Sequence, residues 1–210
     1  MILAIDTAFG PIGAALVSNG GAVVAHLVVP DAIGAQAEKL PPLVARMFAE
    51  AGLKPDALER IAVTTGPGAF TGVRVGLAFA KGMALALKVP LLGFTTLECL
   101  IAQARGARPG AHYAAVIDAR RGELYAQGAD GAFGPALMTI EEARAALAAM
   151  ARPLVLVGSG AAMAAPEGAE LLELNVVDAR VLARLALQAA PASHPPAPCY
   201  LRAPDARLPS

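Results

Sequence analysis

Residues 65–74 read Thr65-Gly66-Pro67-Gly68-Ala69-Phe70-Thr71-Gly72-Val73-Arg74, and this stretch decides the fold. It follows an apolar run at 61–64, which predicts a strand, and precedes an apolar segment at 71–87, which predicts a helix. Its glycines remove side chains where the backbone approaches something closely. The loop is therefore a candidate anion site at a helix start, although a structural turn has the same pattern. It lacks the GxxxxGK[ST] pattern of a Walker A loop.

The predicted helix at 71–87 is apolar nearly all round. Its charges, Arg74 and Lys81, recur every seven residues, with Lys88 just beyond its end. Small residues form two rows at four-residue spacing: Gly72, Gly76, Ala80 and Ala84, and then Ala78, Gly82 and Ala86. A helix of this kind is buried on more than one side, and a sheet covers only one. We hypothesise that a partner covers the other side, so that Gly76→Leu damages assembly more than folding. The alternative is a helix central in its own fold.

The first half of the chain has the pattern of one lobe. Apolar runs at 2–5, 12–17 and 22–29, separated by turn residues, predict a three-stranded meander. A helix is expected at 35–51, with Pro41-Pro42 kinking it or marking a first turn. A strand at 90–94 precedes a helix that Thr95 or Thr96 caps and that ends near Ala104. The Gly- and Pro-rich segment 103–112 marks the lobe boundary, which gives lobes at 1–106 and 107–210.

The second half predicts a smaller lobe. Strands at 114–118 and 123–127 form a hairpin, and Thr139 opens a capping box for a helix at 140–150. A strand at 154–157 follows, then a helix at 179–190 capped by Asp178. The Pro-rich tail, 191–210, is expected to be extended, and no internal repeat is recognisable.

Composition restricts the classes of function. Lys plus Arg and Asp plus Glu both count 17, so direct binding of a nucleic acid by this chain is disfavoured. The apolar region 75–94 is interrupted by Lys81, Lys88 and Pro90, which argues against a membrane span. The start has no basic segment of a signal peptide. Cys99 and Cys199 have no CxxC spacing and are read as reduced thiols of a cytoplasmic protein.

Four stretches resemble the signature sequences of one family, in order and separation. They are Ile2-Leu3-Ala4-Ile5-Asp6-Thr7-Ala8, Gly66-Pro67-Gly68-Ala69-Phe70-Thr71-Gly72-Val73-Arg74, Ile117-Asp118-Ala119-Arg120-Arg121-Gly122-Glu123-Leu124-Tyr125 and Tyr200-Leu201-Arg202. The chain resembles the TsaB (YeaZ) family over essentially its whole length. The second stretch is the most specific of the four.

The resemblance implies a fold and a set of partners. The fold is the actin-like ATPase (Hsp70/hexokinase-type) α/β fold, with two lobes of mixed sheet and flanking helices. The implied role is a non-catalytic subunit that binds and activates the catalytic subunit TsaD, together with the ATPase TsaE, in forming threonylcarbamoyladenosine on tRNA. The chain then forms a homodimer when alone and meets tRNA only through the complex. The expected partner interface comprises Leu40, Leu43, Met47, Gly72, Val73, Arg74, Gly76, Leu77, Ala80 and Lys81.

Nucleotide-site residues are expected only as degenerate remnants, at Asp6, Thr7, Gly66 and Gly68. The segment 157–161 resembles a degenerate form of the Gly-rich adenosine loop of active actin-like ATPases. Gln36 stands where family members often have His. We expect no catalytic residue, no metal and no cofactor of the chain's own; ATP or ADP with Mg²⁺ is expected only at the joint with the partner.

Two other classes of function compete with this reading. A small ATP-dependent phosphotransferase or ATPase would use Asp6, the loop at 66–72 and the glycines at 158–160. For Asp6 we favour the alternative that it orders the first turn by accepting backbone N–H bonds. A metallopeptidase is nearly excluded because His26, His112 and His194 are dispersed. Asp118, Arg120 and Glu123 are expected to form a salt-bridged cluster at the second hairpin, with no assigned chemistry.

Overall fold

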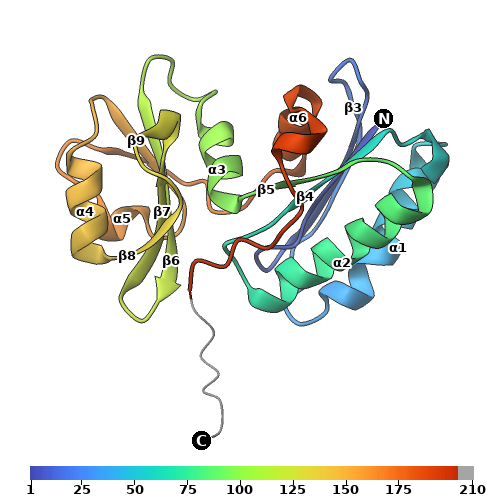
Figure 1. The fold of residues 1–210 in the computed structure, drawn as a ribbon, viewed down its shortest axis with the longest axis horizontal. Helices are drawn as coiled ribbons and strands as arrows, with labels where there is room; N and C mark the ends of the chain where they lie inside the picture. The colour runs from blue at the N-terminus through green and yellow to red at the C-terminus, as the bar shows by residue number, and fades with distance from the viewer. Residues whose placement is uncertain (203–210) are drawn as a thin grey trace, which may run out of the picture.

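The computed structural model describes residues 1–202 and contains two five-stranded sheets (Figure 1). The first sheet has the order β3-β2-β1-β4-β5. Its first three strands form an antiparallel meander, and β4 and β5 extend the sheet in parallel on the other side of β1. The strands are β1 (Ile2–Asp6), β2 (Ile12–Val17), β3 (Val23–Val29), β4 (Arg60–Thr64) and β5 (Leu91–Phe94).

The second sheet repeats this topology, with the order β10-β9-β6-β7-β8. Strands β6, β7 and β8 form the meander, and β9 and β10 extend the sheet in parallel beyond β6. The strands are β6 (His112–Arg120), β7 (Glu123–Gly128), β8 (Ala136–Thr139), β9 (Leu154–Val157) and β10 (Glu170–Leu172). The described chain therefore consists of two lobes with the same strand plan.

The helices form outer and inner layers. Helices α1 (Gln36–Glu50) and α2 (Phe70–Leu87) cover the outer face of the first sheet, and α4 (Ile140–Ala148) and α5 (Ala161–Ala164) cover that of the second (Figure 1). Helices α3 (Thr96–Ala104) and α6 (Ala179–Gln188) lie between the sheets and contact each other. Short 3-10 helices are η1 (Pro55–Ala57), η2 (Ala129–Gly131) and η3 (Pro191–Ser193).

The two inner helices exchange lobes. Helix α3 precedes residue 106 but packs on β6 and β9, whereas α6 follows residue 107 but packs on β1 and β2. All strands of the first sheet precede the predicted boundary, and all strands of the second follow it. One apolar cluster contains Ile2 and Phe94 from the first sheet, Leu97 from α3, Leu182 from α6 and Ile117 from the second sheet. The lobes thus share a core at their joint.

Side-chain caps define three helix starts. The Thr95 hydroxyl accepts from the Glu98 N–H at 3.0 Å, which begins α3. Thr139 and Glu142 form the predicted capping box of α4. Asp178 accepts from the Arg180 N–H at the start of α6. These predicted starts are confirmed, and each satisfies N–H groups that have no partner within the helix.

The sequence did not predict three short elements, β8, β10 and α5. They have four, three and four residues, too few to show a period of two or 3.6. Pro41 and Pro42 lie inside the single helix α1. The tail predicted to be extended from residue 191 begins instead with the 3-10 helix η3, and from there to residue 202 it has no regular structure. The rest of the predicted tail lies outside the described residues.

Helix α2 is also long and apolar enough, by length and composition, to cross a membrane. A third of its residues are buried inside the protein, where α2 packs on α1, β1 and β4. A core helix of a water-soluble fold meets the same length and composition criteria.

Candidate partner-docking face

One edge of α2 packs against the end of β1 through its small residues. We call Gly72, Gly76, Ala80 and Ala84 the inner row; all four are buried. A Cβ on Gly76 would lie 2.3 Å from the Thr7 hydroxyl, and a Cβ on Gly72 would lie 2.1 Å from the Thr7 carbonyl oxygen. The Thr7 hydroxyl donates to the Gly72 carbonyl at 2.7 Å. The inner row therefore allows the helix to lie close to its own sheet.

This packing corrects most of the predicted interface. Eight of the ten predicted residues are buried in the chain's own core, so they are unavailable to a partner in this structure. They are Leu40, Leu43, Met47, Gly72, Val73, Gly76, Leu77 and Ala80. The prediction was wrong for them because they line the helix edges that face the sheet and the other helix. Arg74 and Lys81 are exposed.

The opposite side of α2 is open. Leu85 is 82% exposed and Phe70 is 56% exposed, both large values for apolar side chains. A Cβ on Gly82 would have no neighbour within 4 Å. We define the outer face of α2 by its exposed residues Phe70, Arg74, Ala78, Lys81, Gly82, Leu85 and Ala86. Within it, Ala78, Gly82 and Ala86 form the outer row. An exposed apolar surface with small residues at helical spacing is typical of a docking site for another helix.

The residues predicted as remnants of a nucleotide site, Asp6, Thr7, Gly66 and Gly68, lie together at the carboxyl ends of β1 and β4. There they are in contact with other parts of the same chain. Asp6 is fully buried; its Oδ1 accepts from the Thr64 hydroxyl at 2.7 Å and from the Ala8 N–H at 3.1 Å. Its Oδ2 is buried with no hydrogen-bond partner. Burial raises the pKa of Asp6 to about 6, against the opposing effect of the two hydrogen bonds.

The glycine loop is also in contact with the chain itself. Gly68 lies against Ala8, where a Cβ would be 2.3 Å from the carbonyl oxygen, and the Ala69 N–H donates to that oxygen at 2.7 Å. Gly66 has φ of 92°, a conformation that favours glycine, and the position of its Cβ would be 3.6 Å from the Cys199 carbonyl oxygen. In this arrangement Asp6 and Thr7 are enclosed by the chain itself, and Gly66 and Gly68 lie against the backbone of Cys199 and Ala8.

The hairpin of the second lobe is organised differently from the predicted cluster. Arg120 forms an ion pair with Asp118 at 3.2 Å, and the Asp118 N–H donates to the Ser159 hydroxyl at 3.1 Å. Glu123 pairs instead with Arg202 of the tail. The predicted cluster is therefore correct for Asp118 and Arg120, but not for Glu123.

The segment 194–202, which we call the strap, passes from the end of η3 across the joint of the lobes (Figure 1). Its first residue, His194, stacks on Phe94 with ring centroids 4.3 Å apart, and its Nε2 lies 3.4 Å from a Glu98 oxygen. The Cys199 N–H donates to the Thr65 carbonyl at 2.8 Å. The strap thus covers the glycine loop from the side of the second lobe.

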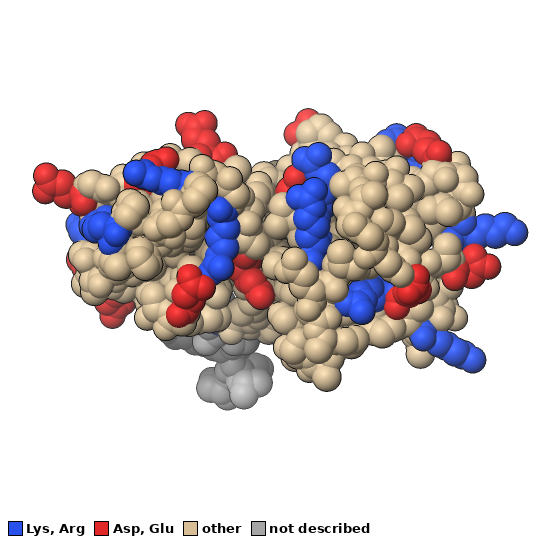
Figure 2. All heavy atoms as spheres, turned by 90° about the horizontal axis from the view of Figure 1, so that it is seen from above, with Lys and Arg blue, Asp and Glu red and all other residues tan. Residues whose placement is uncertain are grey.

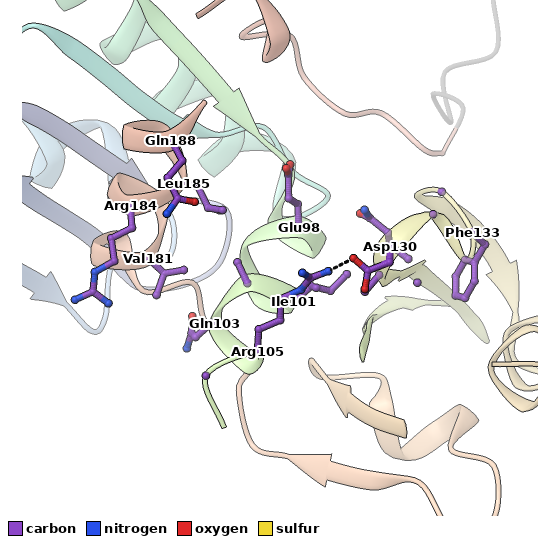
Figure 3. Close-up of a pocket in the computed structure, with 17 residues that line it drawn as sticks. Glu98, Ile101, Gln103, Arg105, Asp130, Phe133, Val181, Arg184, Leu185 and Gln188 are labelled. Atoms are coloured by element: carbon purple, nitrogen blue, oxygen red, sulfur yellow. Dashed lines mark hydrogen bonds and ion pairs between the residues drawn. The ribbon is translucent and has the colours of Figure 1, made fainter. Parts of the chain in front are cut away.

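A cavity of about 610 Å³ opens between α3, η2 and α6 (Figure 3). Arg105 and Asp130 point toward each other across its wall and form an ion pair at 2.5 Å. Glu98 on the same wall is the group that pairs with His194. Among residues 1–202, no group of three or more His, Cys, Asp or Glu side chains is placed to hold a metal ion, in this cavity or elsewhere.

Comparison with known proteins gives the family. The model of the TsaD family, tRNA N6-adenosine threonylcarbamoyltransferase, matches residues 28–156. The chain is 36% identical over 124 residues to the tRNA threonylcarbamoyladenosine biosynthesis protein TsaB of Escherichia coli. The structure of YeaZ from Pseudomonas aeruginosa has a TM-score of 0.76 and 28% identity, and the match covers 95% of this chain and 99% of that one. The chain belongs to the TsaB/YeaZ family.

Coverage differs among the relatives of this TsaB/YeaZ chain. The match to E. coli TsaB covers 59% of the chain and 52% of that protein, about half its length. An uncharacterised Mycobacterium tuberculosis protein is 35% identical over 218 residues, covering 98% of the chain and 93% of that protein. An activator of 2-hydroxyisocaproyl-CoA dehydratase from Clostridium difficile, solved with bound ADPNP, has a TM-score of 0.50 at 11% identity. The predicted actin-like fold of two mixed sheets is confirmed.

Sequence reasoning on this family member missed most of the outer face. Leu85 and Gly82 were not among the predicted interface residues. A signal for them existed in the charges, because Leu85 follows Lys81 by one helical turn and Gly82 is its neighbour. Side chains one turn from an exposed charge lie on the same side of a helix. The charges alone could have separated the outer row from the inner row.

Proposed function

We propose that this TsaB/YeaZ chain is a non-catalytic subunit of the machinery for tRNA threonylcarbamoyladenosine, and that it binds and activates a catalytic chain of the TsaD type. The outer face of α2 carries this proposal. It combines Leu85, the most exposed large apolar side chain of α2, with a row of residues too small to block a second helix.

The partner's class is inferred from shared sequence. The TsaD family model matches a region of this chain that includes α1 and α2. A TsaD-type chain that has equivalent helices can lay them against α1 and α2, and two copies of this chain can pair in the same way. The proposal therefore includes a homodimer in the absence of the catalytic chain, and TsaE as a further member of the complex.

Catalysis is assigned to the partner because the polar residues at the end of β1 already make contacts within the fold. Asp6 and Thr7 are buried and hydrogen-bonded beneath the glycine loop. Any ATP or ADP with Mg²⁺ is proposed at the joint with the partner, and tRNA is met through the complex in the cytoplasm. On the face shown in Figure 2, basic and acidic side chains are interspersed, without an uninterrupted basic surface for phosphates.

Titration calorimetry with a purified TsaD-type chain tests the proposal. Leu85→Arg should weaken association by about 100-fold, because it replaces the most exposed large apolar side chain of the face with a charge. Leu171→Arg is the matched control, since Leu171 is an exposed leucine on β10 of the other lobe. It should leave both association and the free energy of unfolding unchanged.

Reconstituted tRNA modification provides the functional measurement. Omission of this subunit, or its replacement by the Leu85→Arg variant, should abolish threonylcarbamoyladenosine formation. Equal affinity and equal activity for the Leu85→Arg and Leu171→Arg variants would refute the proposed docking face.

A further inference from the structure

The strap forms an anchored connection between the two lobes. On the first lobe, the Gly93 N–H donates to the His194 carbonyl at 2.9 Å. Gly93 is in tight contact with the strap, because a Cβ there would lie 2.8 Å from the Cα of Pro196. With the Cys199 hydrogen bond to Thr65, these contacts fix the strap along the ends of β4 and β5.

The two ends of the signature Tyr200-Leu201-Arg202 reach different lobes. The Arg74 Nε–H of α2 donates to the Tyr200 hydroxyl at 2.9 Å. The Arg202 guanidinium donates to Glu123 of β7 and lies 6.0 Å from the centre of the Tyr125 ring. Arg202 is only 24% exposed at its side chain, so this ion pair is less screened than a fully exposed one. The strap is thus fixed to the second lobe immediately after Tyr200.

Tyr200 completes a three-membered cluster at the start of α2. The Arg74 guanidinium carbon lies 3.5 Å from the centre of the Phe70 ring, and the Phe70 and Tyr200 rings are 5.8 Å apart. Tyr200 is 52% exposed, close to the value for Phe70, although both rings have neighbours. Aromatic rings and arginine held in one geometry are the side chains most often found at energetic centres of protein interfaces.

The cluster is continuous with the outer face of α2. Phe70 and Arg74 begin the stripe that Ala78, Lys81 and Leu85 extend along the helix. This stripe contains two basic residues, and α2 has no acidic residue. The complementary surface is therefore an apolar helix face with an acidic side chain near its end.

We propose that the strap is part of the docking surface for the TsaD-type chain, with Tyr200 in direct contact with that partner. This inference rests on the proposed function and extends it to the carboxyl-terminal segment. Arg202 is a positioning residue: through Glu123 it holds the strap so that Tyr200 stays beside Phe70. The partner's affinity then depends on how the second lobe is placed, although the partner docks on the first.

Calorimetry of full-length variants with the TsaD-type chain tests the contact. Tyr200→Ala should weaken association by about tenfold or more, and Tyr200→Phe should weaken it little, because the ring is retained. Phe70→Ala provides a second variant of the same cluster and should also weaken association about tenfold. Hydrogen exchange of the core strands checks that each variant is folded.

A charge exchange tests the positioning role. Arg202→Glu should weaken association and increase hydrogen exchange at the Cys199 amide, and the double variant Glu123→Arg/Arg202→Glu should restore both. A strap that serves only stability would leave the affinities of these variants equal to that of the wild type.

The outcomes separate the two proposals. If Leu85→Arg abolishes association while Tyr200→Ala and Phe70→Ala bind normally, the strap contact is overturned and the docking face stands. If Leu85→Arg also binds normally, the docking face itself is overturned.

Discussion

The inner and outer rows of α2 have nearly the same composition and opposite environments. The inner row approaches Thr7 so closely that no side chain fits at Gly76. The outer row has open space around Gly82. Glycine and alanine at four-residue spacing thus indicate that another element can approach the helix backbone closely. They do not indicate whether that element is the chain's own sheet or a partner helix. In this protein one row serves the fold, and the other is available to a partner.

The largest expected effect comes from a large side chain in the inner row. Gly76→Leu should lower the free energy of unfolding by about 3 kcal/mol or more, because the new side chain overlaps Thr7 and its surroundings. This reverses the expectation from sequence that the substitution damages assembly more than folding. Urea denaturation of the isolated chain measures the loss.

The matched substitution is Gly82→Leu in the outer row. It should change the free energy of unfolding by less than about 1 kcal/mol, since its Cβ meets nothing within 4 Å. It should, however, weaken association with the TsaD-type chain. Equal losses of stability at the two positions would contradict the assignment of inner and outer rows.

Much of this fold was predictable because its elements have strong local signals. The capped starts of α3, α4 and α6 follow from Thr95, Thr139 and Asp178. The side of α2 that faces the sheet was not predictable from apolar periodicity, because a helix that is apolar all round has no preferred direction for its apolar side. The available indicator was the pair of basic residues in the helix, Arg74 and Lys81, with Lys88 just beyond its end; all three are exposed.

The duplication of the lobes was also invisible in the sequence. The two sheets share strand order and direction, but strand plan depends on pairing between distant segments rather than on residue identity. The second sheet's β8 and β10 are also too short to be recognised. The contacts of the strap were unpredictable for the same reason, since they join distant segments: Tyr200 and Arg74 are 126 residues apart in the sequence.

A smaller effect, dependent on pH, is expected beneath the inner row at Asp6. Its pKa is about 6 in the folded chain, above the ordinary value of 3.8, so the folded state holds the proton more tightly than the unfolded state. The wild type should therefore lose stability as pH rises from about 4 to about 6, by up to about 3 kcal/mol relative to Asp6→Asn. The asparagine retains an oxygen that accepts from Thr64 and Ala8.

Urea denaturation of the wild type and Asp6→Asn at pH 4 and pH 8 measures this difference. The free energy of unfolding of Asp6→Asn, relative to that of the wild type, should be higher at pH 8 than at pH 4. Parallel stability profiles across this range would show that Asp6 keeps an ordinary pKa, contrary to its complete burial without a partner for Oδ2.

The smallest expected effect distinguishes the rows by sign. Gly82→Ala should raise the free energy of unfolding by about 0.5–1 kcal/mol, because alanine favours a helix and has free space there. Gly76→Ala should lower it, because the same methyl group meets the Thr7 hydroxyl at 2.3 Å.

If the outer row lies against a partner helix, the methyl group on residue 82 also holds that helix further away. Gly82→Ala should then be more stable alone yet bind the TsaD-type chain more weakly. Thermal unfolding measures the change in stability, and titration calorimetry on the same preparation measures the change in affinity. A gain in stability with unchanged affinity would place the partner's contact elsewhere on α2, whereas a loss of stability would mean that the outer row is already covered by this chain.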